Sequence, residues 1–234
     1  GKPVRGFTER IALLPYCHLC YSPEIVGDLP PVGSEPPALK NGFVTFGSFN
    51  NFAKVSQETL LLWRGVLEAM PDARFIIKGK IASIPDGRAE VAARLRDIGI
   101  DPARVELRPY SPDYLAQYAD IDVALDTTPY NGGLTTCEAL IMGVPVVSLR
   151  GTTHASRYGA TILEHAGLPE LVAENDADYV KKALRIARSL PILREFHANL
   201  RRALQSSRLM DGPAYMKDME ALYRDLWQRY CGGR

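Results

Sequence analysis

Short apolar runs alternate with longer segments whose apolar residues recur at helical spacing from residue 43 onward. In the first of these longer segments, Leu60, Trp63 and Leu67 fall on one helical face. The predicted strands are 43–49, 73–79, 104–110, 121–126, 144–151 and 170–173. The predicted helices between them are 56–70, 87–100, 112–119, 135–143 and 155–167. This alternation predicts an α/β fold with a doubly wound parallel sheet, and such sheets bind ligands at the carboxyl ends of their strands.

The C-terminal part of the chain is predicted to be helical. One helix begins at a cap formed by Asn175 or Asp176, and a second includes residues 193–205. A third helix carries an apolar face made of Tyr215, Met219, Leu222, Leu226 and Trp227. A free helix would not keep so wide an apolar face in water, so this face should dock on another surface. Within this chain we expect it either to dock on residues 1–42 or to stay partly exposed.

Residues 1–42 differ from the rest because they are rich in proline, with proline pairs at 30–31 and 36–37. Consecutive prolines fix φ and remove backbone donors, which favours extended chain. We therefore expect 1–42 to be a linker or the tail of a preceding lobe, and 43–234 to form a Rossmann-like binding domain with C-terminal helices. The apolar segment 14–23 is either a strand or a tether.

Composition narrows the class of protein. Apolar residues make up 46% of the 234 and charged residues 24%, which is typical of a globular protein and excludes a disordered tail. The net charge of +1 gives no reason to expect nucleic acid or an acidic membrane as a partner. Four cysteines are too few for a disulfide framework, and no signal peptide is visible, so we expect a cytoplasmic setting. The chain opens with Gly1 rather than Met, which suggests a part of a longer protein.

The loop after the predicted strand 121–126 carries the strongest chemical signal. It contains Gly132 and Gly133, and a helix follows near Thr135 and Thr136. Two glycines allow a ligand to approach the backbone, and a helix start offers unpaired N–H groups and two hydroxyls. This arrangement suits a phosphate or diphosphate. It is neither a Walker A loop nor a dinucleotide-binding GxGxxG loop.

Thr135 and Glu138 allow two interpretations. Their spacing is that of a capping box, in which both side chains bond to backbone N–H groups at the helix start. Alternatively, Glu138 points at a hydroxyl-bearing group such as a ribose. The spacing alone is compatible with both.

Two further loops lie at predicted carboxyl ends of strands. Lys54 follows the first strand, where it is either solvated or directed at a ligand. Tyr110 and Tyr114 follow the third strand, where one of them either stacks on a base or packs in the core.

His154 and Arg157 lie in a polar loop after the fifth strand. Arg157 either binds a phosphate or carboxylate or holds two loops together.

Cys17 and Cys20 form a CxxC pair, but a second ligand pair is missing, so we expect no metal site. No G-x-S-x-G nucleophile motif is present either.

Several segments, taken together, resemble the catalytic region of the O-linked N-acetylglucosamine transferase family, the SPINDLY-like family 41 glycosyltransferases, and most of all its bacterial branch. The resemblance covers residues 5–228. It is carried by GFVTFGSFNNFAKVS, LDTTPYNGGLTTCEALIMGVPVVSLRG, HASRYGATIL, GLPELVA and YMKDMEALYRDLW.

The resemblance implies the C-terminal Rossmann-like lobe of a GT-B enzyme and assigns roles to individual residues. Lys54 matches a lysine on the diphosphate, residues 133–136 match the segment around the phosphates, and Glu138 matches an acidic residue on the ribose. Residues from Pro109 to Tyr114 match the loop that receives the uracil. Asn51 falls near the diphosphate or the sugar.

The chain departs from the family pattern at three of these places. Leu134 stands where members often have the first of three threonines. Tyr114 and Gln117 stand where animal members have His and Arg. Gly133 stands where the animal branch has His.

The implied activity is transfer of N-acetylglucosamine from UDP-GlcNAc to Ser or Thr of proteins, with no metal or other cofactor. The preceding lobe and a tetratricopeptide region would hold the protein acceptor, so we expect this chain alone to be inactive. Two other functions stay open: a nucleotide-sugar epimerase of GT-B fold, and a non-catalytic nucleotide-binding or scaffold module.

Overall fold

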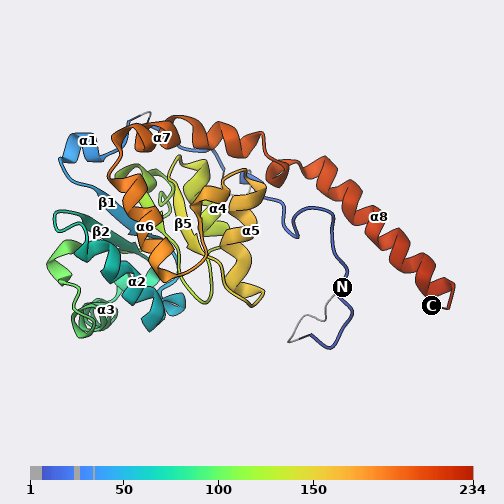
Figure 1. The fold of residues 1–234 in the computed structure, drawn as a ribbon, viewed down its shortest axis with the longest axis horizontal. Helices are drawn as coiled ribbons and strands as arrows, with labels where there is room; N and C mark the ends of the chain where they lie inside the picture. The colour runs from blue at the N-terminus through green and yellow to red at the C-terminus, as the bar shows by residue number, and fades with distance from the viewer. Residues whose placement is uncertain (1–6, 24–26, 34, 234) are drawn as a thin grey trace.

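The computed structural model describes residues 7–23, 27–33 and 35–233. Six strands form one parallel, doubly wound sheet, as predicted, and their order is β3-β2-β1-β4-β5-β6 (Figure 1). The strands are β1 Thr45–Ser48, β2 Arg74–Lys78, β3 Val105–Arg108, β4 Val123–Leu125, β5 Val146–Leu149 and β6 Val172–Ala173. Each lies inside a predicted apolar run, because a parallel strand covered on both faces by helices needs apolar residues on both.

The strand order reverses direction between β1 and β4. Phe46 pairs with Phe75 of β2 on one side and with Val123 of β4 on the other. The chain winds outward from this centre in both directions, which leaves a crevice where the loops after β1 and β4 diverge. Ligands of doubly wound sheets bind at this position.

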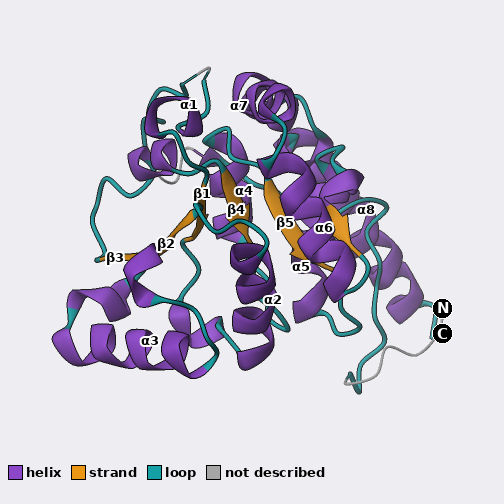
Figure 2. Cartoon of the chain, turned by 60° about the vertical axis from the view of Figure 1, so that its left-hand side comes forward, coloured by secondary structure: helices purple, strands orange, loops and turns teal. Residues whose placement is uncertain are grey.

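Helices cover the sheet on both faces (Figure 2). α6 packs beside α2 and against β5, while α4 and α5 pack against β5 as the helices that follow β4 and β5. α7 packs on α4 and α6 and reaches the amino end of β4. The helices are α1 Ala38–Asn41, α2 Gln57–Glu68, α3 Pro85–Asp97, α4 Leu134–Ile141, α5 Tyr158–His165, α6 Asp176–Ala187, α7 Leu190–Gln205 and α8 Gly212–Cys231.

Local sequence explains where several helices begin and end. The Ser56 side chain accepts from Thr59 N at the start of α2, and the Asn175 side chain accepts from Asp178 N at the start of α6. Of the two predicted candidates for this cap, Asn175 and Asp176, the structure shows that Asn175 is the cap. The helix predicted at 112–119 was wrong: the structure has turns there, followed by a short 3-10 helix, Ala116–Asp120, so Pro112 does not begin a helix.

The N-terminal segment crosses the C-terminal helices as a tether rather than a strand. Tyr21 N donates to Leu209 O at 2.8 Å, and Arg201 donates to Pro30 O at 2.7 Å. Cys17 and Tyr21 are buried. The proposed boundary at residue 42 stays a prediction.

The third C-terminal helix, α8, projects away from the sheet (Figure 1). Tyr215 donates its hydroxyl hydrogen to His18 O at 3.2 Å, but no residue of α8 is buried. Trp227 is 65% exposed and stacks on Tyr230 of the same helix, with ring centroids 5.7 Å apart. Within the described residues the apolar face is therefore partly exposed, which is the second of the two expected outcomes, and only the first turns touch the N-terminal segment. None of the described helices is long and apolar enough to cross a membrane.

Candidate functional site

Asp126 is the centre of the loop that follows β4, at the crevice between β1 and β4. Its side chain is 2% exposed. Oδ1 accepts from Gly132 N at 2.7 Å and from Thr127 N at 2.8 Å, and Oδ2 accepts from Ser148 Oγ at 2.6 Å. Burial raises the pKa of Asp126 to about 6, against the opposing effect of these hydrogen bonds. The Asp126 carboxylate thus bonds to both ends of the loop 127–132 and connects this loop to Ser148 of β5.

Asn50 connects this loop to the end of β1. Its Nδ2 lies 3.4 Å from Asp126 Oδ1, and its Oδ1 accepts from Thr135 Oγ1 at 2.9 Å. A narrow hollow between the two strand ends is lined by Asn50, Asp126, Thr135 and Thr136, among others. Gly132 must be a glycine here, because a Cβ would lie 2.7 Å from both threonine hydroxyls.

Lys54 lies beside the same loop, so the prediction that it reaches the ligand side is confirmed as a placement. Its Nζ donates to Asn131 O at 3.2 Å and lies 4.1 Å from the centre of the Tyr130 ring. Burial lowers the pKa of Lys54, and the Asp126 carboxylate opposes this shift. The ammonium is therefore half-buried and held at the rim rather than solvated.

The capping-box interpretation of Thr135 and Glu138 was wrong. α4 begins at Leu134 after Gly133, and no side chain caps it. Thr135 bonds to Asn50 instead, and Glu138 lies in the first turns of a helix whose N–H groups it does not reach. Within the described residues the N–H groups of Gly133, Leu134 and Thr135 have no acceptor, whereas that of Gly132 is taken by Asp126.

Glu138 is buried and accepts a hydrogen bond from the Tyr114 hydroxyl. Burial raises the pKa of Glu138, and the bond from Tyr114 opposes this shift. Tyr114 is half-buried and packs against the edge of the core, whereas Tyr110 is 58% exposed. The loop after β3 is thus held against α4, and Pro109 begins it with its carbonyl bonded to Lys78 Nζ.

Three other predicted site residues lie apart from this centre. Asn51 is exposed, and its side chain accepts from Ala53 N, which caps the 3-10 turn Phe52–Lys54. His154 and Arg157 are exposed. The loop that carries them meets the glycine loop through the backbone, by Asn131 N donating to Ala155 O at 3.1 Å, and not through Arg157.

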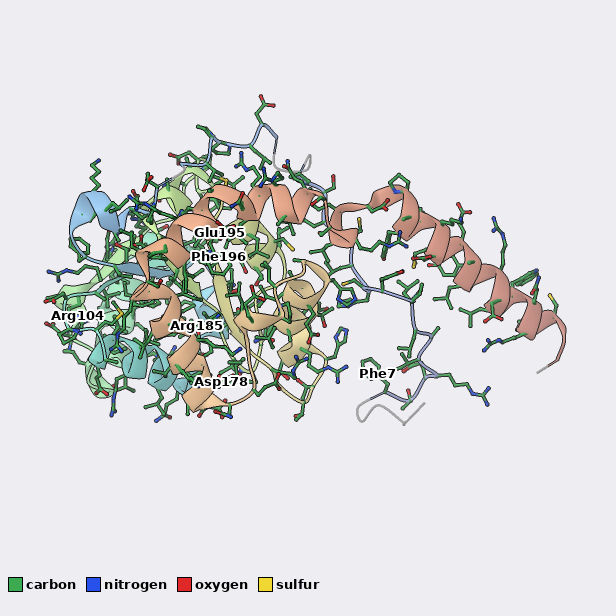
Figure 3. The ribbon with its side chains drawn as sticks, turned by 45° about the horizontal axis from the view of Figure 1, so that its top comes forward. Phe7, Arg104, Asp178, Arg185, Glu195 and Phe196 are labelled. Carbon is green, nitrogen blue, oxygen red and sulfur yellow. The ribbon has the colours of Figure 1, made fainter. Side chains whose placement is uncertain are left out.

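His154 belongs to an aromatic cluster with the N-terminal segment. Its ring centre lies 5.2 Å from that of His18, 5.0 Å from that of Tyr158 and 6.3 Å from that of Phe7. Figure 3 shows Phe7 on the N-terminal segment, on the side of the molecule from which α8 projects. His154 and Tyr158, the first residue of α5, thus pack against His18 of the N-terminal segment.

Sequence reasoning missed most of the buried polar residues at the centre. Asp126 is predicted only as the end of a strand, Asn50 suits a turn by its residue type, and Tyr179 is expected only on the apolar face of a helix. Ser148 has no predicted role beyond its place in a strand. Tyr179 donates to Asp126 O at 2.9 Å from α6. The available signal was a polar residue inside or directly after an apolar strand, which fits Asp126 and Ser148.

The described residues contain no group of three His, Cys, Asp or Glu side chains placed to hold a metal ion. Cys17 and Cys20 are free thiols, and burial raises the pKa of both. At the site, Lys54 supplies an ammonium group, and the start of α4 supplies N–H groups with partial positive charge. Together they suit an anion such as a diphosphate, because a helix start and an ammonium both favour negative charge.

Comparison with known proteins agrees with this geometry. The model of the family described as glycosyl transferase family 41 matches residues 35–219. A protein from Eustoma exaltatum subsp. russellianum, described as probable UDP-N-acetylglucosamine--peptide N-acetylglucosaminyltransferase SPINDLY, is 41% identical over 228 residues, which are 96% of this chain and 24% of that protein. A Caenorhabditis elegans UDP-N-acetylglucosamine--peptide N-acetylglucosaminyltransferase is 30% identical over 83% of this chain and 17% of its own length.

A solved structure extends the likeness to three dimensions. A mutant of the Thermobaculum terrenum O-GlcNAc transferase superposes with a TM-score of 0.83 at 35% identity, over 96% of this chain and 42% of that one. The S. aureus protein TarM shares the fold at 18% identity, with a TM-score of 0.57. The chain therefore spans about a quarter of the curated relatives it matches and has the fold of a Rossmann-like lobe of a GT-B glycosyltransferase. It belongs to glycosyl transferase family 41.

Proposed function

We propose that this chain is the donor-binding lobe of an enzyme that transfers N-acetylglucosamine from UDP-GlcNAc to Ser or Thr hydroxyls of proteins. The observation that carries the proposal is the joining of Lys54, the glycine loop and the uncapped start of α4 at the crevice between β1 and β4. Relatives described as peptide N-acetylglucosaminyltransferases support the reaction class.

Each group at the crevice has a proposed part. The N–H groups of residues 133–135, with the hydroxyls of Thr135 and Thr136, bind the diphosphate, and Lys54 leaves Asn131 O to bind it as well. Glu138 accepts from the ribose hydroxyls. The loop from Pro109 to Tyr114 receives the uracil.

Asn51, His154 and Arg157 are proposed as outer contacts to the sugar and phosphates. All three are exposed, so they reach a ligand only from the open side of the crevice.

The chemistry asked of this lobe is stabilisation of the leaving group. When the bond from the sugar to the diphosphate breaks, negative charge builds up on UDP. The fixed N–H dipoles offset this charge without having to reorient, and such preorganised electrostatics is usually the largest contribution to rate. The Lys54 ammonium adds to it once it has turned from Asn131 O to the diphosphate. We expect these groups to serve in place of a metal ion, so chelator should leave UDP affinity unchanged.

The remaining parts of the reaction belong to segments outside this chain. We propose that a preceding lobe and a tetratricopeptide region hold the protein acceptor in a cytoplasmic setting. Positioning the hydroxyl against the sugar contributes many powers of ten in rate, so this chain alone should not transfer sugar.

Turnover of UDP-GlcNAc by the full-length parent tests the proposal. Labelled sugar should appear on Ser or Thr of an acceptor protein, and Lys54→Ala in the parent should abolish most of this transfer. Release of an epimerised sugar, or no turnover by a folded parent that binds UDP, would contradict it.

A further inference from the structure

A buried lysine on the neighbouring strand fastens the base-receiving loop. Lys78 ends β2, and its side chain is 4% exposed. Its Nζ donates to Pro109 O at 2.6 Å and to Ser111 Oγ at 2.9 Å. Burial lowers the pKa of Lys78, and the Asp113 carboxylate opposes this shift. An ammonium withdrawn from water must be compensated by hydrogen bonds or opposite charge, and here the two bonds to the loop and the Asp113 carboxylate supply this.

Each of residues 109–111 forms a hydrogen bond to another part of the chain. Besides the two bonds from Lys78, Tyr110 N donates to Ser83 Oγ at 3.3 Å. Gln117 Nε2 then donates to Ser111 Oγ at 2.7 Å, which closes the loop on itself. The loop is therefore a fixed structure built around the Lys78 ammonium.

The far end of the same loop reaches the proposed ribose carboxylate. Tyr114 lies between Ser111 and Gln117 in sequence and bonds to Glu138 of α4. The diphosphate seat depends on other groups, namely Asp126, Asn50 and Lys54, none of which bonds to Lys78. Base binding and diphosphate binding thus have separate supports.

We propose that Lys78 is a positioning residue that sets nucleobase selectivity by fixing residues 109–117, an inference that rests on the proposed function of the crevice. Lys78 does not touch the ligand. It holds the loop backbone so that Tyr114 and the outer side of the loop meet the base in one arrangement. Loss of the ammonium releases the loop and leaves the diphosphate seat intact.

Titration calorimetry of the chain with UDP, CDP and inorganic pyrophosphate tests this. Lys78→Met should weaken UDP about tenfold, as expected for bonds to a charged group, and should remove the preference for UDP over CDP. Its affinity for pyrophosphate should stay within about twofold of the wild type, because the two supports are separate. Lys181→Met is the control: Lys181 is exposed on α6, outside the base-receiving loop, and its substitution should change none of the three affinities.

Two further variants test the role of Lys78 if Lys78→Met folds poorly. Ser111→Ala removes one acceptor at the loop surface and should reduce the UDP preference in the same direction, by a smaller factor. Lys78→Arg keeps the charge and donors and should restore part of the preference. A folded Lys78→Met or Ser111→Ala variant with the wild-type UDP preference would overturn the inference, as would an equal loss of UDP and pyrophosphate. A wild-type chain that binds none of the three would instead overturn the proposed function.

Discussion

The two ends of strand β4 carry buried aspartates with opposite surroundings. Asp122, at the amino end, accepts from Ala38 N at 2.9 Å and from Thr45 N at 2.8 Å. Asp126, at the carboxyl end, holds the glycine loop and lies close enough to Lys54 to affect its pKa. Burial raises the pKa of each to about 6.

The difference lies in what is left unpaired around each carboxylate. At the amino end, α1 and β1 take both oxygens, and His197 of α7 lies over the Asp122 carbonyl, with Nε2 3.3 Å from that oxygen. At the carboxyl end, N–H groups at the start of α4 have no acceptor within the described residues, and the Lys54 ammonium beside them is bonded to Asn131 O. The two carboxylates therefore differ in role. Asp122 joins α1 to β1, and Asp126 fixes the conformation of the glycine loop.

Lys54→Ala should give the largest effect on binding, at the carboxyl end only. Removing a charged hydrogen bond to the diphosphate should weaken UDP by about 1.5–3 kcal/mol and uridine hardly at all. Calorimetry with both ligands measures this. An equal loss for uridine would place Lys54 at the base instead of the diphosphate.

Asp122→Asn should give the largest effect on stability, at the amino end only. Both oxygens face backbone N–H donors, so an amide NH2 there meets a donor and leaves one N–H unpaired, which costs about 1–3 kcal/mol. Urea unfolding measures the loss, and UDP affinity should not change.

Asp126→Asn is the matched variant at the other end of the strand. One oxygen of Asp126 faces Ser148 Oγ, a hydroxyl that can turn to accept from an amide. Its loss of unfolding free energy should therefore be smaller than that of Asp122→Asn. The reverse order would contradict the assigned hydrogen bonds.

The pH dependence of stability should reflect both carboxyls. Each has a folded-state pKa of about 6, above its ordinary value of 3.8, so the folded state binds more protons between these values. Stability contributed by the two groups is therefore present below about pH 4 and is lost as pH rises through about 6. Urea unfolding across this range should show a falling free energy, and each Asn variant should flatten part of the slope.

Two adjacent glycines offer a smaller, steric test at the carboxyl end. Gly132→Ala places a Cβ 2.7 Å from the Thr135 and Thr136 hydroxyls and 3.1 Å from Asp126 Oδ1. This should cost about 1 kcal/mol of stability, at the low end of what overpacking costs. Gly133→Ala meets nothing within 4 Å and should leave the melting temperature unchanged. Equal melting temperatures for the two variants would show that the loop is looser than the structure indicates.

The fold could be predicted from the sequence because its signal is periodic and local. Apolar runs separated by helical patterns gave the six strands, and Asn175 as a candidate cap gave the start of α6. The helix predicted from Pro112 failed because the bonds of Ser111 and Tyr114 to other elements hold that segment in turns. Tertiary contacts there outweigh local preference.

Only the residues of the candidate site that carry a local signal could be proposed from the sequence. Lys54 and the glycine loop carry local signals, whereas the roles of Asn50 and Lys78 depend on which strand lies beside which. The capping box failed for the same reason, since Thr135 and Glu138 found partners on β1 and on the loop after β3. Neither partner is close in sequence.

Binding of UDP compared with UMP by the wild-type chain tests the central claim most directly. If the start of α4 and Lys54 form a diphosphate seat, calorimetry should show UDP binding at least about tenfold more tightly than UMP, because the second phosphate gains charge-assisted hydrogen bonds. Equal affinities for UDP and UMP, or no binding of either by the folded chain, would contradict the claim that the carboxyl end of β4 is a donor site.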